Sequence, residues 1–257
     1  MQPGLRWAVY GILLSQWSKL FAEFPRLSCI SSRSPMVDHS AIYRSRSIWH
    51  WHHRSRLHQV LREAARFAEA GSVADIGCSN GYVTNLLSQV CSGEVHGFDY
   101  LPEMVKSARA VYPDLVFRRA DLNRVIKWDQ QYDLVCCFET LEHVGDVSSA
   151  LTNIRAAVRD GGTLIVSVPV ETGMWGMAKF CVKMLAGYSM DEIDAGRGEY
   201  AMALLRGADI SQFRKASYTW GTHFGFDWRE LERQISTTMH IQKAYTKFAT
   251  RVIVARV

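Results

Sequence analysis

The chain has 257 residues, of which 48% are apolar and 21% are charged, so its length suits one domain with a modest extension. This composition excludes a disordered chain, and the lack of a fixed sequence period excludes a repeat array. The net charge of +5 arises mainly from residues 42–66, which hold six arginines and one acid. The rest of the chain is close to neutral, which disfavours a nucleic-acid-binding fold.

Residues 1–35 form an extension that we treat separately from the main domain, residues 36–257. Aromatic and leucine side chains recur there at spacings of three and four, which predicts one face of a helix ending before Pro25: Trp7, Tyr10, Leu14, Trp17, Phe21 and Phe24. The longest apolar run is much shorter than the roughly 20 residues of a spanning helix. The helix could pack on the domain, contact a membrane surface peripherally through residues 4–24, or belong to a targeting segment. Alternatively, translation starts at Met36.

The basic residues 42–66 also contain Trp49, Trp51 and four histidines. One interpretation is a solvated helix face that leads into the first strand, with the tryptophans buried. The other is a site for an anion, such as a phosphate or carboxylate of a substrate, a nucleotide sugar, a lipid surface or RNA. For RNA, Arg54→Ala and Arg56→Ala should weaken binding with a reduced salt slope.

The main domain is expected to alternate strands and helices, which indicates an α/β fold with a mostly parallel sheet covered on both faces. The helix over residues 147–158 should stop at Asp160-Gly161-Gly162. Two further strands, over 241–245 and 251–256, follow a helix over 227–234. The first part of the sheet is expected from strands over 72–76, 94–99, 115–118, 134–138 and 163–168, with further helices over 82–90 and 102–111.

Six cysteines, none of them in a C-x-x-C pair, indicate core packing rather than a disulfide framework. Cys136 and Cys137 are adjacent in an expected strand, so their side chains should point to opposite faces. A reduced, cytoplasmic location follows, with membrane contact only peripheral.

Polar and glycine residues follow the expected strands, at the edge where such sheets bind ligands. Gly77 and Gly81, in V-A-D-I-G-C-S-N-G-Y, allow a tight turn close to a ligand and lead into a helix N-terminus. Asp99 lies 22 residues after Gly77, at the end of the second strand, where a carboxylate can accept both hydroxyls of a ribose. Asp121 follows the third strand and could accept an adenine amine. This spacing predicts a nucleoside-containing cofactor.

These motifs, from about Val73 to Val168, resemble the class I S-adenosylmethionine-dependent methyltransferases, and within them the small-molecule branch that includes the ubiquinone-biosynthesis O-methyltransferases. The resemblance implies a Rossmann-like, doubly wound, seven-stranded sheet with a terminal antiparallel strand. It implies S-adenosylmethionine as the cofactor. The residues that match its binding motifs are Asp75, Gly77, Ser79, Gly81, Asp99, Tyr100, Asp121, Leu122, Phe138 and Glu139.

One residue departs from the family pattern D-x-G-x-G-x-G, because Ser79 replaces the second glycine. Serine is small enough to accommodate a close ligand. The dinucleotide pattern G-x-G-x-x-G is not present in this loop, since Ser79 and Tyr82 occupy two of its glycine positions. A nicotinamide-dependent reductase is therefore disfavoured.

Catalysis of methyl transfer depends mainly on positioning the acceptor. For a hydroxyl acceptor, His143 is the best candidate for a base, with Glu142 beside it, although His143 could instead pack the end of the fourth strand. In the ubiquinone-biosynthesis relatives, the set Glu139, Glu142 and His143 resembles a magnesium site. We do not favour magnesium, because Glu139 could serve the cofactor and Glu142 a helix N-terminus.

The acceptor site should lie between the N-terminal segment and an insertion over about residues 171–220. Its apolar, methionine-rich helix over 174–185 suits a lid on a hydrophobic acceptor, although ordinary core packing also explains it. His223 and Phe224 stand where the chain returns to the core. We expect O-methylation of a small-molecule, lipid-like or sugar acceptor, which could be anionic. The alternatives are N-methylation, for example of an amino sugar, and a non-catalytic protein that binds S-adenosylmethionine.

Overall fold

The computed structural model describes residues 51–257, and for Trp51 and His52 it describes the backbone alone. The aromatic helix predicted over residues 7–24, the alternative start at Met36 and the side chain of Trp49 lie outside the described residues.

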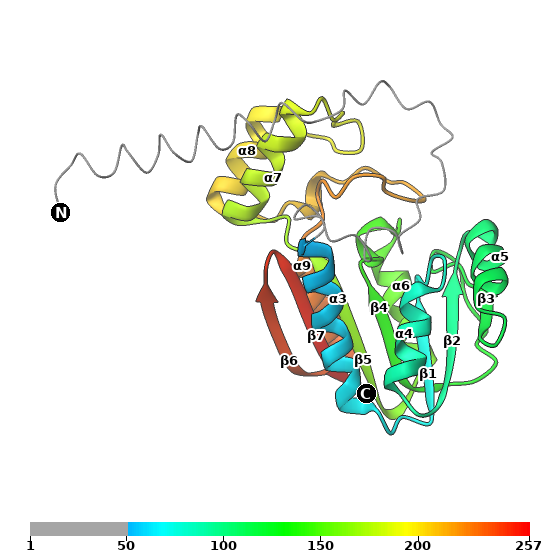
Figure 1. The fold of residues 1–257 in the computed structure, drawn as a ribbon. Coiled ribbons are helices and arrows are strands. Elements are labelled where there is room, and N and C mark those ends of the chain that lie inside the picture. Colours follow the sequence, from blue (N-terminus) through cyan, green and yellow to red (C-terminus); the bar gives the residue numbers. More distant parts are fainter. Residues whose placement is uncertain (1–50) are drawn as a thin grey trace. The chain divides into compact units, whose positions relative to one another are not determined.

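A seven-stranded sheet with the order β3-β2-β1-β4-β5-β7-β6 forms the centre of the domain (Figure 1). The first five strands are parallel, and β7 pairs antiparallel with both β5 and β6. The predicted sheet and its terminal antiparallel strand are confirmed. The strands are β1 (Ser72–Ile76), β2 (Glu94–Asp99), β3 (Val116–Arg119), β4 (Tyr132–Phe138), β5 (Val158–Pro169), β6 (His240–Lys247) and β7 (Thr250–Arg256).

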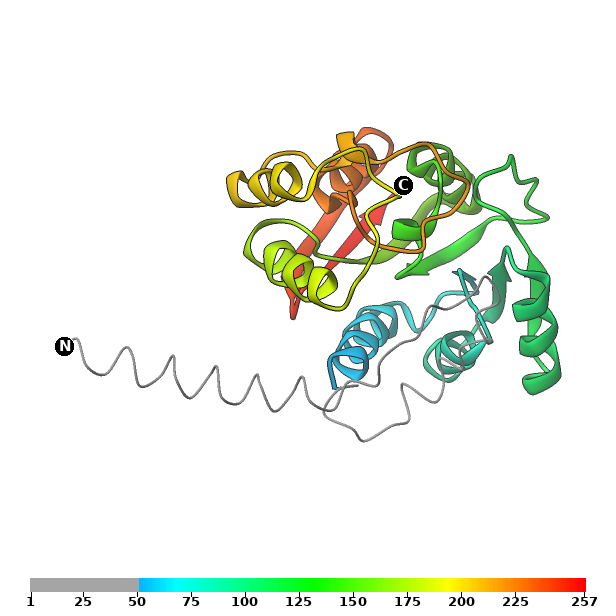
Figure 2. The ribbon, with the colours of Figure 1, turned by 90° about the horizontal axis from the view of Figure 1, so that it is seen from above.

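Helices cover both faces of this sheet, as the doubly wound prediction requires (Figure 2). One face packs against α3 (Trp51–Ala64) and α4 (Tyr82–Val90), and the other against α6 (Val147–Ala157) and α9 (Trp228–Thr238). A fifth helix, α5 (Pro102–Val111), packs on β2 and β3, and the short turn η2 (Ala65–Phe67) follows α3. Apolar residues alternate along the central strands, so each face has its own core.

Cys136 and Cys137 illustrate this alternation, because the first belongs to the core under α3 and α4 and the second to the core under α6 and α9. The five described cysteines are all free. Core packing of the adjacent pair is therefore confirmed. Among residues 51–257, no helix is both long and apolar enough to cross a membrane.

The predicted helix over residues 147–158 is confirmed to within one residue, but Asp160-Gly161-Gly162 is not the turn that follows it. Helix α6 ends at Ala157, where Val158 turns to extended backbone and begins β5. The β4–β5 register passes from Tyr132↔Val158 to Leu134↔Thr163, so residues 159–162 leave the ladder within β5. Gly161, with φ of 73°, permits this excursion.

The inserted segment follows β5 and contains α7 (Gly173–Leu185), α8 (Arg197–Arg206) and the turn η4 (Ser211–Phe213), with the helices beyond the carboxyl end of β5 (Figure 1). It has a separate apolar core, centred on Phe180, Tyr200 and Phe224. Two α7 methionines, Met177 and Met184, pack against that core, while Met174 is exposed. Core packing therefore accounts for part of the methionine-rich pattern, and a lid role remains a prediction.

Candidate active site

A cavity of about 660 Å³ opens where β1, β2 and β4 end. Its wall includes the loop after β1 and the residues that follow β2, β3 and β4. It also includes part of residues 217–224, the return segment, which leads from the insertion back to the core. Nine of the ten predicted cofactor residues line it together with both candidate catalytic residues: Asp75, Gly77, Ser79, Asp99, Tyr100, Asp121, Leu122, Phe138, Glu139, Glu142 and His143.

Gly81 does not line the cavity. It caps α4 with φ of 82°, and a Cβ at this position would lie 2.7 Å from the ring of Phe117. Packing against Phe117 therefore requires glycine at position 81. Gly77 does line the cavity. A Cβ at this position would lie 2.1 Å from Oγ1 of Thr140, so only glycine lets the loops after β1 and β4 approach this closely.

The carboxylate of Asp99 holds the loop after β1 in place. Its Oδ2 accepts the backbone N–H of Ser79 at 2.9 Å, and its Oδ1 accepts that of Leu101 at 3.0 Å. Ser79 has φ of 48°, so it adopts the left-handed conformation that glycine favours at this position. The serine therefore preserves the glycine-type backbone.

Asp75 is buried at the end of β1 and accepts a hydrogen bond from the Thr84 hydroxyl at 2.6 Å. Burial raises its pKa to about 7, an effect that the Thr84 hydrogen bond partly offsets and the charge of Asp99 reinforces.

Asp121 is linked to the return segment. The hydroxyl of Tyr218 donates to its Oδ2, and the backbone N–H of Asn123 donates to Oδ1 at 3.1 Å. The Asn123 side chain in turn donates to the Tyr218 carbonyl at 3.0 Å. The return segment is thus bound to the loop after β3.

Glu139 forms an ion pair with Arg56 of α3 and accepts a hydrogen bond from the Ser167 hydroxyl at 3.1 Å. Arg56 also contacts His53, and both residues line the cavity. Sequence reasoning placed Arg56 only within the basic stretch, and no motif indicated its partner. Arg54 and other basic residues of α3 line a separate hollow of about 590 Å³ beside β6.

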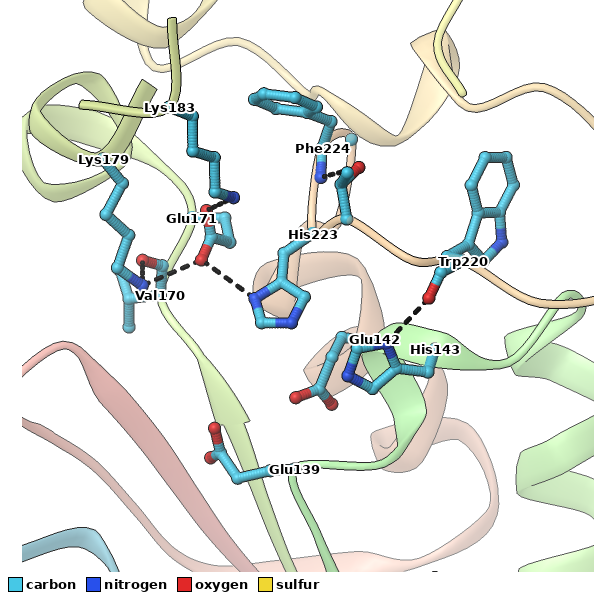
Figure 3. Close-up of polar contacts among 12 residues, drawn as sticks. Glu139, Glu142, His143, Val170, Glu171, Lys179, Lys183, Trp220, His223 and Phe224 are labelled. Carbon is cyan, nitrogen blue, oxygen red and sulfur yellow. Dashed lines mark hydrogen bonds and ion pairs between the residues drawn. The ribbon is translucent and has the colours of Figure 1, made fainter. Parts of the chain in front are cut away.

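The metal set considered from the sequence was Glu139, Glu142 and His143. Within residues 51–257, the group whose potential metal-binding atoms all lie within 4.8 Å of one another is Glu142, His143 and His223 (Figure 3). Glu139 is not part of this group and forms an ion pair with Arg56. His223 was noted from the sequence only as a residue where the chain returns to the core, because motif spacing does not show that the return segment meets the end of β4.

Glu142 and His143 lie in the turn η3 (Leu141–His143) after β4. The Glu142 side chain is 1% exposed, and its Oε2 is buried without a hydrogen-bond partner. Burial and the nearby charge of Glu139 raise the pKa of Glu142 well above its usual value.

The ring of His143 is oriented by the return segment. Its Nδ1 lies 2.8 Å from the carbonyl oxygen of Trp220, which can only accept, so Nδ1 carries the proton. The backbone N–H of Trp220 donates to the His143 carbonyl at 3.0 Å, and Val144 pairs with Thr219 in an antiparallel bridge. Burial lowers the pKa of His143, the hydrogen bond to the Trp220 carbonyl partly offsets this effect, and the charges of His223 and Arg214 reinforce it, which favours the neutral imidazole.

His223 is oriented by a buried ion-pair network in the insertion. Its Nδ1 lies 3.3 Å from Oε1 of Glu171, which also accepts a hydrogen bond from Lys179 at 2.8 Å (Figure 3). Oε2 of the same carboxylate accepts one from Lys183 at 3.2 Å. Burial alone would raise the pKa of Glu171, but the His223 hydrogen bond and the two lysines lower it to about 2. Because Glu171 is ionised, it accepts the proton of His223 Nδ1.

A methyltransferase domain family matches residues 48–225, which is more than half of the chain. The chain belongs to this family. Its sheet order and cavity agree with the class I S-adenosylmethionine-dependent methyltransferases, which bind that cofactor in a Rossmann-like fold.

Three curated relatives show the range of this class. A probable S-adenosylmethionine-dependent methyltransferase of Mycolicibacterium smegmatis is 31% identical over 44% of this chain and 44% of its own length. A ubiquinone biosynthesis O-methyltransferase of Proteus mirabilis is 32% identical over 42% and 45%, and a trans-aconitate 2-methyltransferase of Variovorax paradoxus is 32% identical over 45% and 45%. The chain spans under half the length of the curated relatives it matches.

Solved structures share the fold at low sequence identity. Magnesium protoporphyrin IX methyltransferase of Synechocystis with bound S-adenosylhomocysteine has a TM-score of 0.56 and 15% identity, covering 84% of this chain and 91% of that one. The N-methyltransferase NodS of Bradyrhizobium japonicum has a TM-score of 0.53 and 14% identity, covering 80% and 96%.

Proposed function

We propose that this methyltransferase moves a methyl group from S-adenosylmethionine to a hydroxyl of a small organic acceptor. The observation that carries the proposal is the position of His143 in the cavity wall with its Nδ1–H donated to the Trp220 carbonyl, because the other ring nitrogen can then take the proton of a hydroxyl.

The residues present fit the cofactor. The cavity of about 660 Å³ is within the range of cofactor pockets, and it brings the Asp99 carboxylate, the Gly77 loop and Asp121 to one wall. Asp99 is suited to the ribose hydroxyls and Asp121 to the adenine amine. When bound, S-adenosylmethionine supplies a sulfonium methyl group, whose C–S bond breaks and leaves its electron pair on sulfur as the new bond to the acceptor forms.

The acceptor would meet the part of the cavity formed by η3 and the return segment. His143 Nδ1–H is committed to the Trp220 carbonyl, so Nε2 is the nitrogen that would receive the acceptor proton. Trp220 and Thr219 add apolar and hydroxyl surface to the same wall, which suits an acceptor with both characters. Lipid-like and sugar-like molecules that carry a hydroxyl have both characters.

N-methylation is the alternative, since a neutral amine needs no strong base. We expect His143→Gln to lower kcat on a hydroxyl acceptor by at least a hundredfold with little change in S-adenosylhomocysteine affinity. An effect on kcat of less than threefold would instead support an amine acceptor. Product analysis of small-molecule extracts incubated with methyl-labelled S-adenosylmethionine would identify the C–O or C–N bond directly.

Calorimetric titration with S-adenosylhomocysteine tests the cofactor site before any acceptor is known. Asp99→Ala should weaken binding at least tenfold, which corresponds to about 1.4 kcal/mol. This variant also removes two loop hydrogen bonds, so its melting temperature is measured alongside. Binding without turnover on any extract would favour a non-catalytic cofactor-binding protein, and no binding by the folded parent would contradict the proposal.

A further inference from the structure

We propose that Glu142, His143 and His223 bind a divalent transition-metal ion, for which Zn²⁺ is the best match. This inference deepens the proposed function, on which it rests, because the cluster forms part of the same cavity. With a metal ion bound, Nε2 of His143 would be a ligand and not the base, and the cation would itself favour loss of the acceptor proton. It assigns His223, a residue of the return segment, as a metal ligand in place of Glu139.

The donor atoms of this cluster suit a transition-metal ion. One carboxylate oxygen and two imidazole nitrogens lie within 4.8 Å of one another. Ligands about 2.1 Å from a tetrahedral zinc ion are separated by about 3.4 Å, so moderate side-chain rotations complete the site. Two nitrogens and one oxygen suit zinc and similar ions, whereas Mg²⁺ prefers oxygen ligands alone.

Both histidines are oriented as metal ligands usually are. A metal-binding histidine normally donates its other ring N–H to a carboxylate or a backbone carbonyl. Here Nδ1 of His143 donates to the Trp220 carbonyl and Nδ1 of His223 to the Glu171 carboxylate. The remaining ring nitrogen of each histidine lies toward Glu142 in Figure 3. The Lys179 and Lys183 ammonium groups fix Glu171 in turn.

The carboxylate of Glu142 supplies an independent observation. Its Oε2 is buried and has no hydrogen-bond partner, an arrangement that is costly unless a proton or a cation satisfies it. Arg214 does not fill this role, because its guanidinium donates to the Glu142 backbone carbonyl at 2.7 Å. A bound cation would satisfy the oxygen.

Glu139 is excluded from the site by its own partners. Arg56 neutralises it, and the Ser167 hydroxyl donates to its second oxygen. A site with three protein ligands leaves at least one position for a ligand from the cavity. The acceptor hydroxyl of the proposed reaction would occupy that position.

Metal binding is tested on the full chain after treatment with a chelator. We expect Zn²⁺ to bind with a stoichiometry of one in calorimetric titration and Co²⁺ to give the visible absorption of a site with nitrogen ligands. His223→Ala and Glu142→Gln should each weaken Zn²⁺ binding more than tenfold. The matched controls Glu139→Gln and His240→Ala, which replaces an exposed histidine of β6, should retain it.

S-adenosylhomocysteine titration and the melting temperature of every variant show whether the fold and the cofactor site persist. Absence of Zn²⁺ and Co²⁺ binding in a parent that still binds S-adenosylhomocysteine would overturn the metal site and leave the proposed function intact. Zn²⁺ binding that survives His223→Ala would overturn the assignment of His223. Mg²⁺ binding that Glu139→Gln abolishes would overturn the assignment of His223 in favour of the set Glu139, Glu142 and His143.

Discussion

The hydroxyl of Tyr218 donates a hydrogen bond to the carboxylate of Asp121, across 97 residues of sequence. This contact joins the segment that returns from the insertion to the loop after β3, where the adenine of the cofactor is expected to bind. The return segment thus contacts the cofactor side of the cavity through Asp121 and the acceptor side through His143. Its position should affect both ligands.

Removal of the Tyr218 hydroxyl should loosen this contact. A hydrogen bond to a charged group is worth about 1.5–3 kcal/mol, and part of that energy is recovered through water in the variant. We expect Tyr218→Phe to increase the dissociation rate of S-adenosylhomocysteine about threefold to tenfold in stopped-flow measurements. Tyr188→Phe, an exposed tyrosine of the insertion, is the control and should leave the rate unchanged. A slower dissociation would mean that the hydroxyl competes with the cofactor for Asp121.

Gly145 fixes how closely the return segment approaches η3. A Cβ at this position would lie 2.1 Å from the carbonyl oxygen of Ser217, which is incompatible with the observed backbone. We expect Gly145→Ala to displace residues 217–220 and to increase their amide hydrogen exchange at least tenfold, because their bonds to His143 and Val144 would break. Gly198→Ala, whose Cβ would meet open space, should leave the exchange of this segment unchanged. Equal protection in both variants would contradict the close packing.

The sequence was sufficient for the sheet and for most of the cavity wall, because both depend on local patterns. Strand periodicity identified β1 and β2 at their exact bounds, and the end of each strand carries its ligand-facing residue within a few positions. Asp99 and Asp121 were predicted in this way, and the structure brings them to the same cavity. Gly81 was assigned to the ligand by motif alone, while its tight contact is with Phe117 of β3.

Contacts between distant segments could not be predicted. Arg56 meets Glu139 across 83 residues, and His223 approaches Glu142 from beyond the insertion. Periodicity assigns each of these residues to a face or a loop, but their meeting depends on how α3 and the return segment pack over the carboxyl ends of the strands. For the same reason, the E-x-x-E-H spacing could not indicate that a donor atom of His223 lies within 4.8 Å of those of Glu142 and His143.

Ser79 occupies a glycine position and adopts a glycine conformation. Its φ of 48° is costly for a residue with a Cβ, and its hydroxyl contributes only a long contact of 3.6 Å to the Met104 sulfur. We expect Ser79→Gly to have a free energy of unfolding about 0.5–1 kcal/mol higher than Ser79→Ala, because only glycine relieves the backbone strain. Urea denaturation of both variants measures the difference. Equal stabilities would show that the loop relaxes to a negative φ without loss.

Asp75 should make the stability of the protein depend on pH. Burial raises its pKa from a usual value of 3.8 to about 7, so between about pH 4 and 7 the folded protein holds a proton that the unfolded chain releases. The free energy of unfolding should therefore fall as the pH rises through this window. Asp75→Asn keeps an oxygen that can accept the Thr84 hydroxyl and removes the charge. We expect this variant to exceed the parent by about 1–3 kcal/mol near pH 8 and to match it near pH 4.

Urea denaturation across this pH range, with the parent and the variant measured together, isolates Asp75 from the other titrating groups. The exposed acid Asp114 provides the matched control, and Asp114→Asn should follow the parent curve. Parallel curves for Asp75→Asn and the parent would mean that Asp75 is ionised throughout, which would require a cationic partner at the end of β1. A difference that grows with pH would instead show that ionisation of this buried carboxyl lowers the free energy of unfolding.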